Sequence, residues 1–317
     1  MWLASSAIIK LVLVAFLGFS LYRRKYIDDK VLSFLTSFVI KFTVPFLIFS
    51  HLTDNADIVL NHSIFIFLAI SIVIFFAGYI LGLIFSFRKS AEFRKEFIST
   101  VSLQNSGYLP MNIAFLLFSS VLREEFLVYI FLYILGFDVI FWSVGSFFIF
   151  KKKGEKFRIK SLFTPPIIST ALALLLIYTL YARTTFRMPF LIISPLKMVG
   201  DTSFVLSMLI LGSWLARVRI EGIRKRLFAL AEASVLKLIL LPLLFLLLTY
   251  KLGLLSLLGV FIVLEAAMPS AASLPIIADL RGADNEFISQ GVFFTHILSI
   301  FTIPAWLYIM KLLGFNF

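Results

Sequence analysis

Apolar stretches of about 20 residues follow one another along the whole chain, and short polar or charged segments separate them. A helix needs about 20 mostly apolar residues to cross the hydrocarbon core of a bilayer. On this basis the pattern predicts ten membrane spans at 3–22, 31–51, 63–86, 96–119, 125–149, 163–182, 192–216, 227–249, 254–280 and 286–311. Because the connections are short, consecutive spans are expected to be antiparallel. The fold class predicted is an all-α integral membrane protein with ten transmembrane helices.

The composition agrees with this prediction. Hydrophobic residues make up 61% of the chain and charged residues 15%, whereas soluble domains are about 45–50% apolar. Cysteine is absent, which excludes disulfides and cysteine-ligated metals. The three histidines, His51, His62 and His296, lie far apart in the sequence, so no metal site is expected. The sequence contains no sign of a resident cofactor.

The positive charges are distributed unevenly between alternate loops. Of the 29 Lys and Arg residues, 20 lie in one set of loops, 6 lie in the opposite set, and Lys10, Lys41 and Lys237 lie within spans. Cytoplasmic loops of membrane proteins carry an excess of positive charge, so both termini are predicted to lie outside. The net charge of +12 then reflects topology and contact with membrane lipids, and no nucleic-acid partner is expected.

Five predicted spans precede a basic segment, "KKKGEKFRIK" (151–160), and five follow it. An odd number of spans per half requires that a repeat be inverted in the membrane. The predicted organisation is a first five-helix repeat at 1–150, a cytoplasmic linker at 151–162 and a second, inverted repeat at 163–317. A shift of about 165 residues places Leu109-Pro110 on Leu274-Pro275 and Asn105 on Ser270.

Helix-breaking residues interrupt two spans at these corresponding positions. Span four contains "QNSGYLPMN" (104–112) and span nine contains "EAAMPSAASLP" (265–275). Proline removes a backbone donor and glycine permits unwinding. Two interrupted helices at matching repeat positions point to a ligand site near mid-membrane, and exposed helix N-termini favour an anion there. The alternative is two proline kinks that neighbouring helices stabilise.

Four stretches resemble the auxin efflux carrier family, which includes bacterial malate and malonate permeases. They are "QNSGYLP", "LKMVGDTSFVLSMLILGSWLA" (196–216), "EAAMPSAASLPIIADLRGADNEF" (265–287) and "THILSIFTIPAW" (295–306). The resemblance implies a 5+5 inverted repeat like that of the bile acid–sodium symporters, in which broken helices four and nine cross. It also implies a scaffold of helices 1, 2, 6 and 7 and a mobile transport unit of helices 3–5 and 8–10. Because Pro110 comes early and Asn112 follows it, no substrate identity is carried over.

The candidate site residues come from the broken spans and from polar residues inside the membrane, which are functional hypotheses by default. The resemblance implies that Asn105 contacts a substrate carboxylate. The substrate-binding candidates are Asn105, Gly107, Pro110, Asn112, Pro269, Ser270 and Ser273, and the ion-coupling candidates are Glu265, Asp138, Gln104 and Gln290.

Four of the polar positions inside the membrane have open alternatives. Glu265 is expected either to couple transport to an ion or to be a protonated acid that caps the break. Lys41 and Asp201 fall at equivalent places in the two halves, so an ion pair between them is an open question. His296 is either a buried histidine with satisfied hydrogen bonds or part of a proton relay.

The function expected is secondary transport of small organic anions, either mono- or dicarboxylates, by alternating access in a prokaryotic cytoplasmic membrane. A sodium-coupled symporter and a non-transporting membrane sensor are the alternatives, and Na⁺ or H⁺ is the candidate coupling ion. A homodimer is one option for the assembly. No enzyme activity is expected, because Met198 stands where the Gly-x-Gly-Asp motif of intramembrane aspartyl proteases needs its first glycine. No G-x-x-x-x-G-K-[ST] nucleotide motif occurs either.

Overall fold

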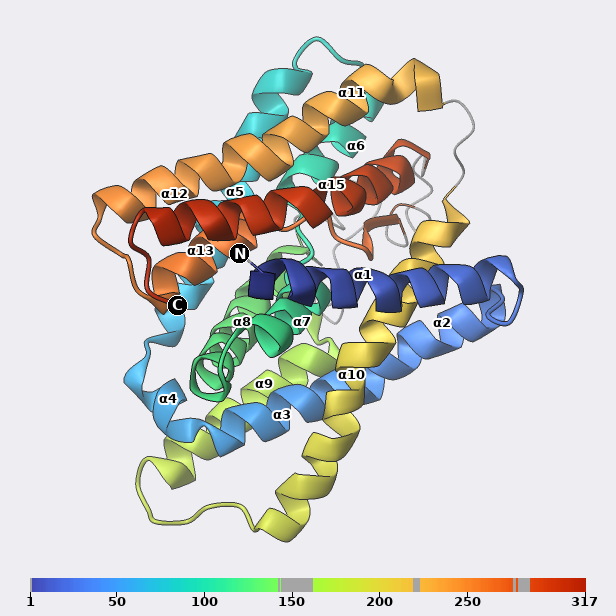
Figure 1. The fold of residues 1–317 in the computed structure, drawn as a ribbon. Coiled ribbons are helices and arrows are strands. Elements are labelled where there is room, and N and C mark those ends of the chain that lie inside the picture. Colours follow the sequence, from blue (N-terminus) through green and yellow to red (C-terminus); the bar gives the residue numbers. More distant parts are fainter. Residues whose placement is uncertain (1, 142, 144–161, 219–222, 276–277, 279–285) are drawn as a thin grey trace.

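The computed structural model describes residues 2–141, 143, 162–218, 223–275, 278 and 286–317 (Figure 1). These residues form helices and one isolated backbone bridge, with no strand among them. The helices of the first half are α1 (Trp2–Arg23), α2 (Asp29–Phe38), α3 (Val44–Asp54), α4 (Ala56–Asn61), α5 (Ile64–Ser86), α6 (Ala91–Ser102), α7 (Tyr108–Leu117) and α8 (Ser120–Ile140). Those of the second half are α9 (Pro165–Leu176), α10 (Phe190–Arg217), α11 (Ile223–Val235), α12 (Leu241–Lys251), α13 (Leu257–Ala267) and α15 (Glu286–Leu312).

Three predicted spans are continued through single π-helical turns. These turns are η1 (Val39–Thr43) between α2 and α3, η4 (Ile177–Tyr181) after α9, and η5 (Leu236–Leu240) between α11 and α12. Pro45 and Pro242 follow η1 and η5 closely. Proline cannot donate a backbone hydrogen bond to the preceding turn, which accounts for the widened turn at these two places.

The helices are long and apolar enough for a membrane protein. Five described helical segments could each cross a bilayer by length and composition: Asp29–Asp54, Ile64–Ser86, Phe190–Arg217, Ile223–Lys251 and Glu286–Leu312. Large apolar side chains such as Phe65, Phe190 and Phe301 project from the helix surfaces, where 72% or more of each is exposed. The chain is therefore an integral membrane protein, while the count of ten spans and their orientation stay predictions.

One group of helices, called the first group below, consists of α1, α2, α3, α9 and α10. Within it, α10 packs along α1 and α3, and α3 also packs along α9. The contact between α1 and α10 is close, because a Cβ atom on Gly212 would overlap the carbonyl group of Ala15 and one on Gly18 would overlap the backbone of Leu209. Small residues allow membrane helices to approach in this way.

A second group consists of α5, α6, α8, α11, α12, α13 and α15. Here α5 packs against α6 and α8, α11 against α15, and α13 against α12 and α15. Gly78 on α5 lies so close to α6 that an added Cβ atom would stand 2.9 Å from the Cα atom of Ser102. Helix α7 contacts α1 and α10 of the first group and α8 of the second (Figure 1), so the segment that leads into α7 lies where the two groups meet.

The described residues leave three predicted segments incomplete. The expected linker at 151–162 lies outside them except for Leu162, as does the end of span five beyond residue 143. Most of span nine after Pro275 also lies outside them.

Candidate functional site at the crossing of two broken helices

The predicted break in span four is present and separates α6 from α7. Helix α6 ends at Ser102, and Leu103 is extended (φ −100°, ψ 110°). Helix α7 begins after Gly107, its N-cap residue, and no side chain caps the N–H groups of its first turn. Pro110 is the third residue of α7, a position whose N–H has no partner inside a helix, so proline is tolerated there. The break therefore leaves residues 103–107 as non-helical backbone inside the protein.

The predicted break in span nine is also present, and a proline again accompanies the interruption. Helix α13 ends at Ala267, and Met268 is extended (φ −65°, ψ 142°). The residue before a proline is disfavoured in the helical region, and Pro269 follows directly. Non-helical backbone in a membrane protein requires partners for its polar groups.

The two broken segments supply those partners to each other. The Asn105 N–H donates to the Pro269 carbonyl (2.8 Å), and the Ala271 N–H donates to the Leu103 carbonyl (2.9 Å). Together they form an antiparallel bridge in which Gln104 faces Ser270. Proline kinks in separate helices would not produce this pairing, so the two breaks form one structural unit.

Ser270 fixes the bridge to its surroundings. Its hydroxyl donates to the Thr100 carbonyl at the end of α6 (2.7 Å), and its N–H donates to the Thr295 hydroxyl on α15 (3.2 Å). Because its polar atoms are used in this way, Ser270 holds the crossing together rather than facing a cavity.

A cavity of about 140 Å³ opens beside the crossing. Its walls come from the broken segments, from α7 and α8 on one side, and from η1, α3 and α9 of the first group on the other. The lining includes Ile40, Val44, Gln104, Asn105, Ser106, Gly107, Tyr108, Asp138, Thr164, Pro166 and Ser273. The cavity therefore lies between the two helix groups and combines amide, hydroxyl and carboxylate side chains with apolar walls.

Asp138 on α8 is the acidic group in this cavity wall. Its carboxylate accepts a hydrogen bond from the Thr164 hydroxyl (3.3 Å). Thr164 is also the N-cap of α9, where its oxygen accepts from the Ile167 N–H (3.4 Å) and two prolines follow. One threonine thus starts a helix of the first group and contacts an acid of the second.

Two ionisable side chains near the crossing are fully buried. Glu265 is in the last turn of α13, Lys237 is in η5, and both have 0% of their surface exposed. The lysine lies within electrostatic range of the carboxylate, but they do not form a direct ion pair, and neither has a well-formed hydrogen bond to a described residue. Ser106 lies beside the carboxylate without such a bond.

Gln104 connects this interior to the cavity. Its side-chain amide donates to the Tyr133 hydroxyl (2.5 Å) on α8, and its carbonyl oxygen has no hydrogen-bond partner among the described residues. Of the four ion-coupling candidates, Gln104 and Asp138 line the cavity, and Glu265 lies beside Ser106 of the cavity wall. Gln290 is fully buried on α15 and does not line the cavity.

Asn105 faces His296 of α15. The amide nitrogen of Asn105 lies 3.1 Å from Nε2 of His296, and Nδ1 of His296 lies 2.8 Å from the Val292 carbonyl. In this arrangement Nδ1 carries the proton and Nε2 accepts from Asn105. His296 is therefore a buried histidine with both nitrogens bonded, which is the first of the two alternatives from the sequence.

His296 also forms part of the wall of a second, larger cavity of about 300 Å³. This cavity lies between α1, α7, α10 and α15 and is almost wholly apolar. It suits hydrocarbon better than a charged group, so the smaller cavity at the crossing is the better candidate for polar chemistry.

The remaining predicted residues have different surroundings. Asn112 on α7 donates to the Tyr108 carbonyl (2.7 Å) and to the Ser207 hydroxyl of α10 (3.0 Å), and it does not line the smaller cavity. Pro110 and Pro269 shape the breaks. Gly107 lines the cavity, but a Cβ atom there would make ordinary contacts at 3.7 and 3.9 Å. A side chain of alanine size therefore fits at Gly107 without close contacts.

The open pairing of Lys41 with Asp201 is also resolved. Lys41 is exposed on η1, whereas Asp201 of α10 lies 3.3 Å from Nε2 of His51. Sequence reasoning missed this contact, as it missed Tyr133 and the burial of Lys237. For Thr164, the sequence did contain a signal: a threonine followed by two prolines is typical of a helix N-cap.

Comparison with known families agrees with this architecture. A family model described as membrane transport protein matches residues 3–161 and matches a second time at residues 154–307. The first match contains the five spans predicted before the linker, and the second contains most of those predicted after it. No protein with a curated description matches the chain.

Proposed function

The chain belongs to the auxin efflux carrier family of membrane transport proteins, and on that premise we propose that it is a secondary transporter of small organic anions. The proposed substrates are mono- or dicarboxylates, and the proposed site is the cavity beside the crossing. The proposed mechanism is alternating access in a prokaryotic cytoplasmic membrane, in which one helix group moves against the other.

The observation that carries this proposal is the antiparallel bridge between residues 103–107 and 268–271, with a cavity of about 140 Å³ beside it. Broken helices that meet at the interface of two repeats are the recurrent location of transporter sites. The cavity has walls from both helix groups, so a sliding or rocking movement between them would change its access.

The local chemistry supports a carboxylate ligand. The amide of Asn105 can donate to a carboxylate, as can the uncapped N–H groups in the first turn of α7, where the helix dipole is positive. The Asn105–His296 contact would orient the amide. Apolar residues such as Ile40 and Val44 would contact the hydrocarbon part of the ligand.

The acids at the site support the use of a coupling ion. Asp138 in the cavity wall would repel an anionic ligand unless a proton or a metal cation neutralised it. Glu265 lies at the C-terminal end of α13, where the helix dipole is negative, and its carboxylate lacks a well-formed hydrogen bond. These features favour symport of the anion with Na⁺ or H⁺, and sodium-coupled symport is therefore the second candidate.

Counterflow into proteoliposomes tests the proposal. Vesicles loaded with an unlabelled carboxylate should take up the same labelled carboxylate transiently, and Asn105→Ala should abolish this uptake. Asn61→Ala, at an exposed asparagine that ends α4, is the matched control and should transport normally. Absence of counterflow for every mono- and dicarboxylate tested, with and without Na⁺, would refute anion transport.

A further inference from the structure

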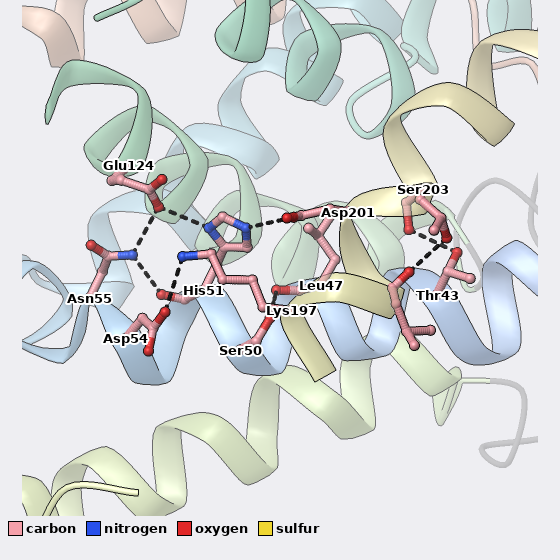
Figure 2. Close-up of polar contacts among 12 residues, drawn as sticks. Thr43, Leu47, Ser50, His51, Asp54, Asn55, Glu124, Lys197, Asp201 and Ser203 are labelled. Atoms are coloured by element: carbon pink, nitrogen blue, oxygen red, sulfur yellow. Dashed lines mark hydrogen bonds and ion pairs between the residues drawn. The ribbon is translucent and has the colours of Figure 1, made fainter. Parts of the chain in front are cut away.

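His51 connects three helices that are far apart in the sequence. It lies in the last turn of α3, and only 3% of its surface is exposed. Its Nδ1 atom lies 2.9 Å from Oε2 of Glu124 on α8, and its Nε2 atom lies 3.3 Å from Oδ1 of Asp201 on α10 (Figure 2). Helices α3 and α10 belong to the first group and α8 to the second.

This contact differs from the other ion pairs that the described helices form. Lys197–Asp54 and Arg217–Asp29 lie within the first group, and Arg226–Glu286 lies within the second. The His51–Glu124 pair joins one group to the other. A relative movement of the two groups would have to break it.

The geometry makes the contact depend on a proton. An ionised carboxylate can only accept hydrogen bonds, and a neutral imidazole has one N–H group to donate. Both ring nitrogens of His51 face a carboxylate, so both must carry hydrogen for the two contacts to exist together. The arrangement in Figure 2 is therefore that of an imidazolium, and loss of its proton would leave one carboxylate facing a lone pair.

The surroundings of the ring favour the proton. Glu124 accepts a further bond from the Asn55 amide (3.0 Å), and the nearby cation, Lys197, is already paired with Asp54 (3.0 Å). The imidazolium is thus the group that balances the two carboxylates on either side of it.

No other element packed against α3 adds a charge that faces the ring. Helix α9 contains no titratable residue. Lys41 on η1 is exposed nearly three turns away, and Asp57 on α4 pairs with Arg187. The carboxylates are more accessible than the ring, with 28% of the Glu124 side chain and 46% of the Asp201 side chain exposed against 4% for His51. They offer protons a path between water and the imidazole.

We infer that His51, Glu124 and Asp201 form a proton-binding site that controls the movement of one helix group against the other. A proton taken from water through the carboxylates holds α8 against α3 and α10. When α8 leaves, the ring keeps one N–H group, and the other proton returns to water. The inference rests on the proposed function for its use in transport, but the site itself is testable without a substrate.

Spin-label distance measurements in lipid nanodiscs test the site directly, and the absence of native cysteine makes labelling specific. Labels at Val121→Cys on α8 and Leu191→Cys on α10, both strongly exposed positions, report the separation of the two groups. When the pH is raised from about 5 to about 8, the range in which histidine loses its charge, the population with the shorter distance between the labels should fall. We expect a change of about fivefold or more, the lower end of typical coupling between sites.

Two variants should remove this pH dependence: His51→Gln and the milder Glu124→Gln at a partly exposed position. The chain also offers matched controls, because Glu125, the neighbour of Glu124 on α8, pairs with His62 at the end of α4. His62→Gln and Glu125→Gln should keep the pH dependence. A distance distribution that is independent of pH in the unmodified chain would overturn the inference, as would pH dependence that survives in both His51→Gln and Glu124→Gln.

A failure of this inference and a failure of the proposed function are distinguishable. If the labels respond to pH as expected but no carboxylate shows counterflow, the proton site stands and the anion substrate is wrong. If counterflow occurs and the labels do not respond to pH, the transporter stands and the proton site is wrong.

Discussion

The buried ionisable side chains of Lys237 and Glu265 lead to a quantitative prediction. Neither side chain has exposed surface, and each lies within the field of the other without a direct ion pair. Removing one member of a buried pair leaves the other uncompensated, which costs about 3–5 kcal/mol, whereas replacing both with uncharged residues is often nearly neutral. Because the two groups do not touch, the low end of that range applies.

Lys237→Met and Glu265→Gln should therefore each lower the free energy of unfolding by about 3 kcal/mol. The double variant should be about as stable as the unmodified chain. The resulting coupling energy, the difference between the double variant and the sum of the two single changes, is about 6 kcal/mol in size, well above the 0.3–0.5 kcal/mol within which independent changes typically add up. Lys251→Met, at an exposed lysine that ends α12, is the matched control and should have little effect.

The assay is equilibrium unfolding in mixed micelles of a mild detergent and dodecyl sulfate, followed by tryptophan fluorescence. Trp306 is a suitable reporter, because its indole N–H donates to the Leu238 carbonyl (2.8 Å) inside the same π-helical turn that carries Lys237. If the losses of unfolding free energy from the two single changes simply add in the double variant, the two side chains do not interact. The interpretation of the interior as an electrostatically coupled pair would then be wrong.

Three further predictions follow from the site and the packing. The Glu265→Gln variant should still bind and exchange substrate, but it should no longer accumulate substrate against a gradient, and its transport should no longer depend on pH or Na⁺. If accumulation survives, Glu265 is not the ion-coupling residue and Asp138 becomes the next candidate for that role. Gly107→Ala should leave stability within about 0.5 kcal/mol, whereas Gly78→Ala should lower it by about 1–3 kcal/mol through overlap with α6, as unfolding measurements would show. Cysteines introduced at position 2 or 317 should react with impermeant reagents from outside intact cells. Labelling only from the cytoplasmic side would contradict the predicted orientation, in which both termini lie outside.

The positions of the helices and of the breaks were predictable from the sequence because their causes are local. Apolar stretches set the helices, and Gly107, Pro110 and Pro269 set the interruptions within them. The matching spacing of the breaks in the two halves also indicated that they belong together, and the bridge between Gln104 and Ser270 agrees with that expectation.

The direction in which each polar side chain points was not predictable. These helices are apolar on most sides, so their pattern has little of the periodicity that reveals a buried face. Asn105 and Asn112 are seven residues apart and equally polar, yet one lines the cavity and the other bonds to α10. The partners of His51 come from positions 73 and 150 residues away, and such contacts depend on the packing of three helices rather than on any local pattern.

Direct ligand binding to the purified protein tests the central claim that the crossing holds an organic anion. Titration of mono- and dicarboxylates, with tryptophan fluorescence during heating as the readout, detects a ligand because specific binding stabilises the native state. We expect at least one carboxylate to raise the unfolding temperature, and we expect Asn105→Ala to weaken its affinity tenfold or more, about 1.4 kcal/mol or more. Asn61→Ala should bind as the unmodified chain does. Equal affinity in Asn105→Ala, or no stabilisation by any carboxylate, would contradict the claim.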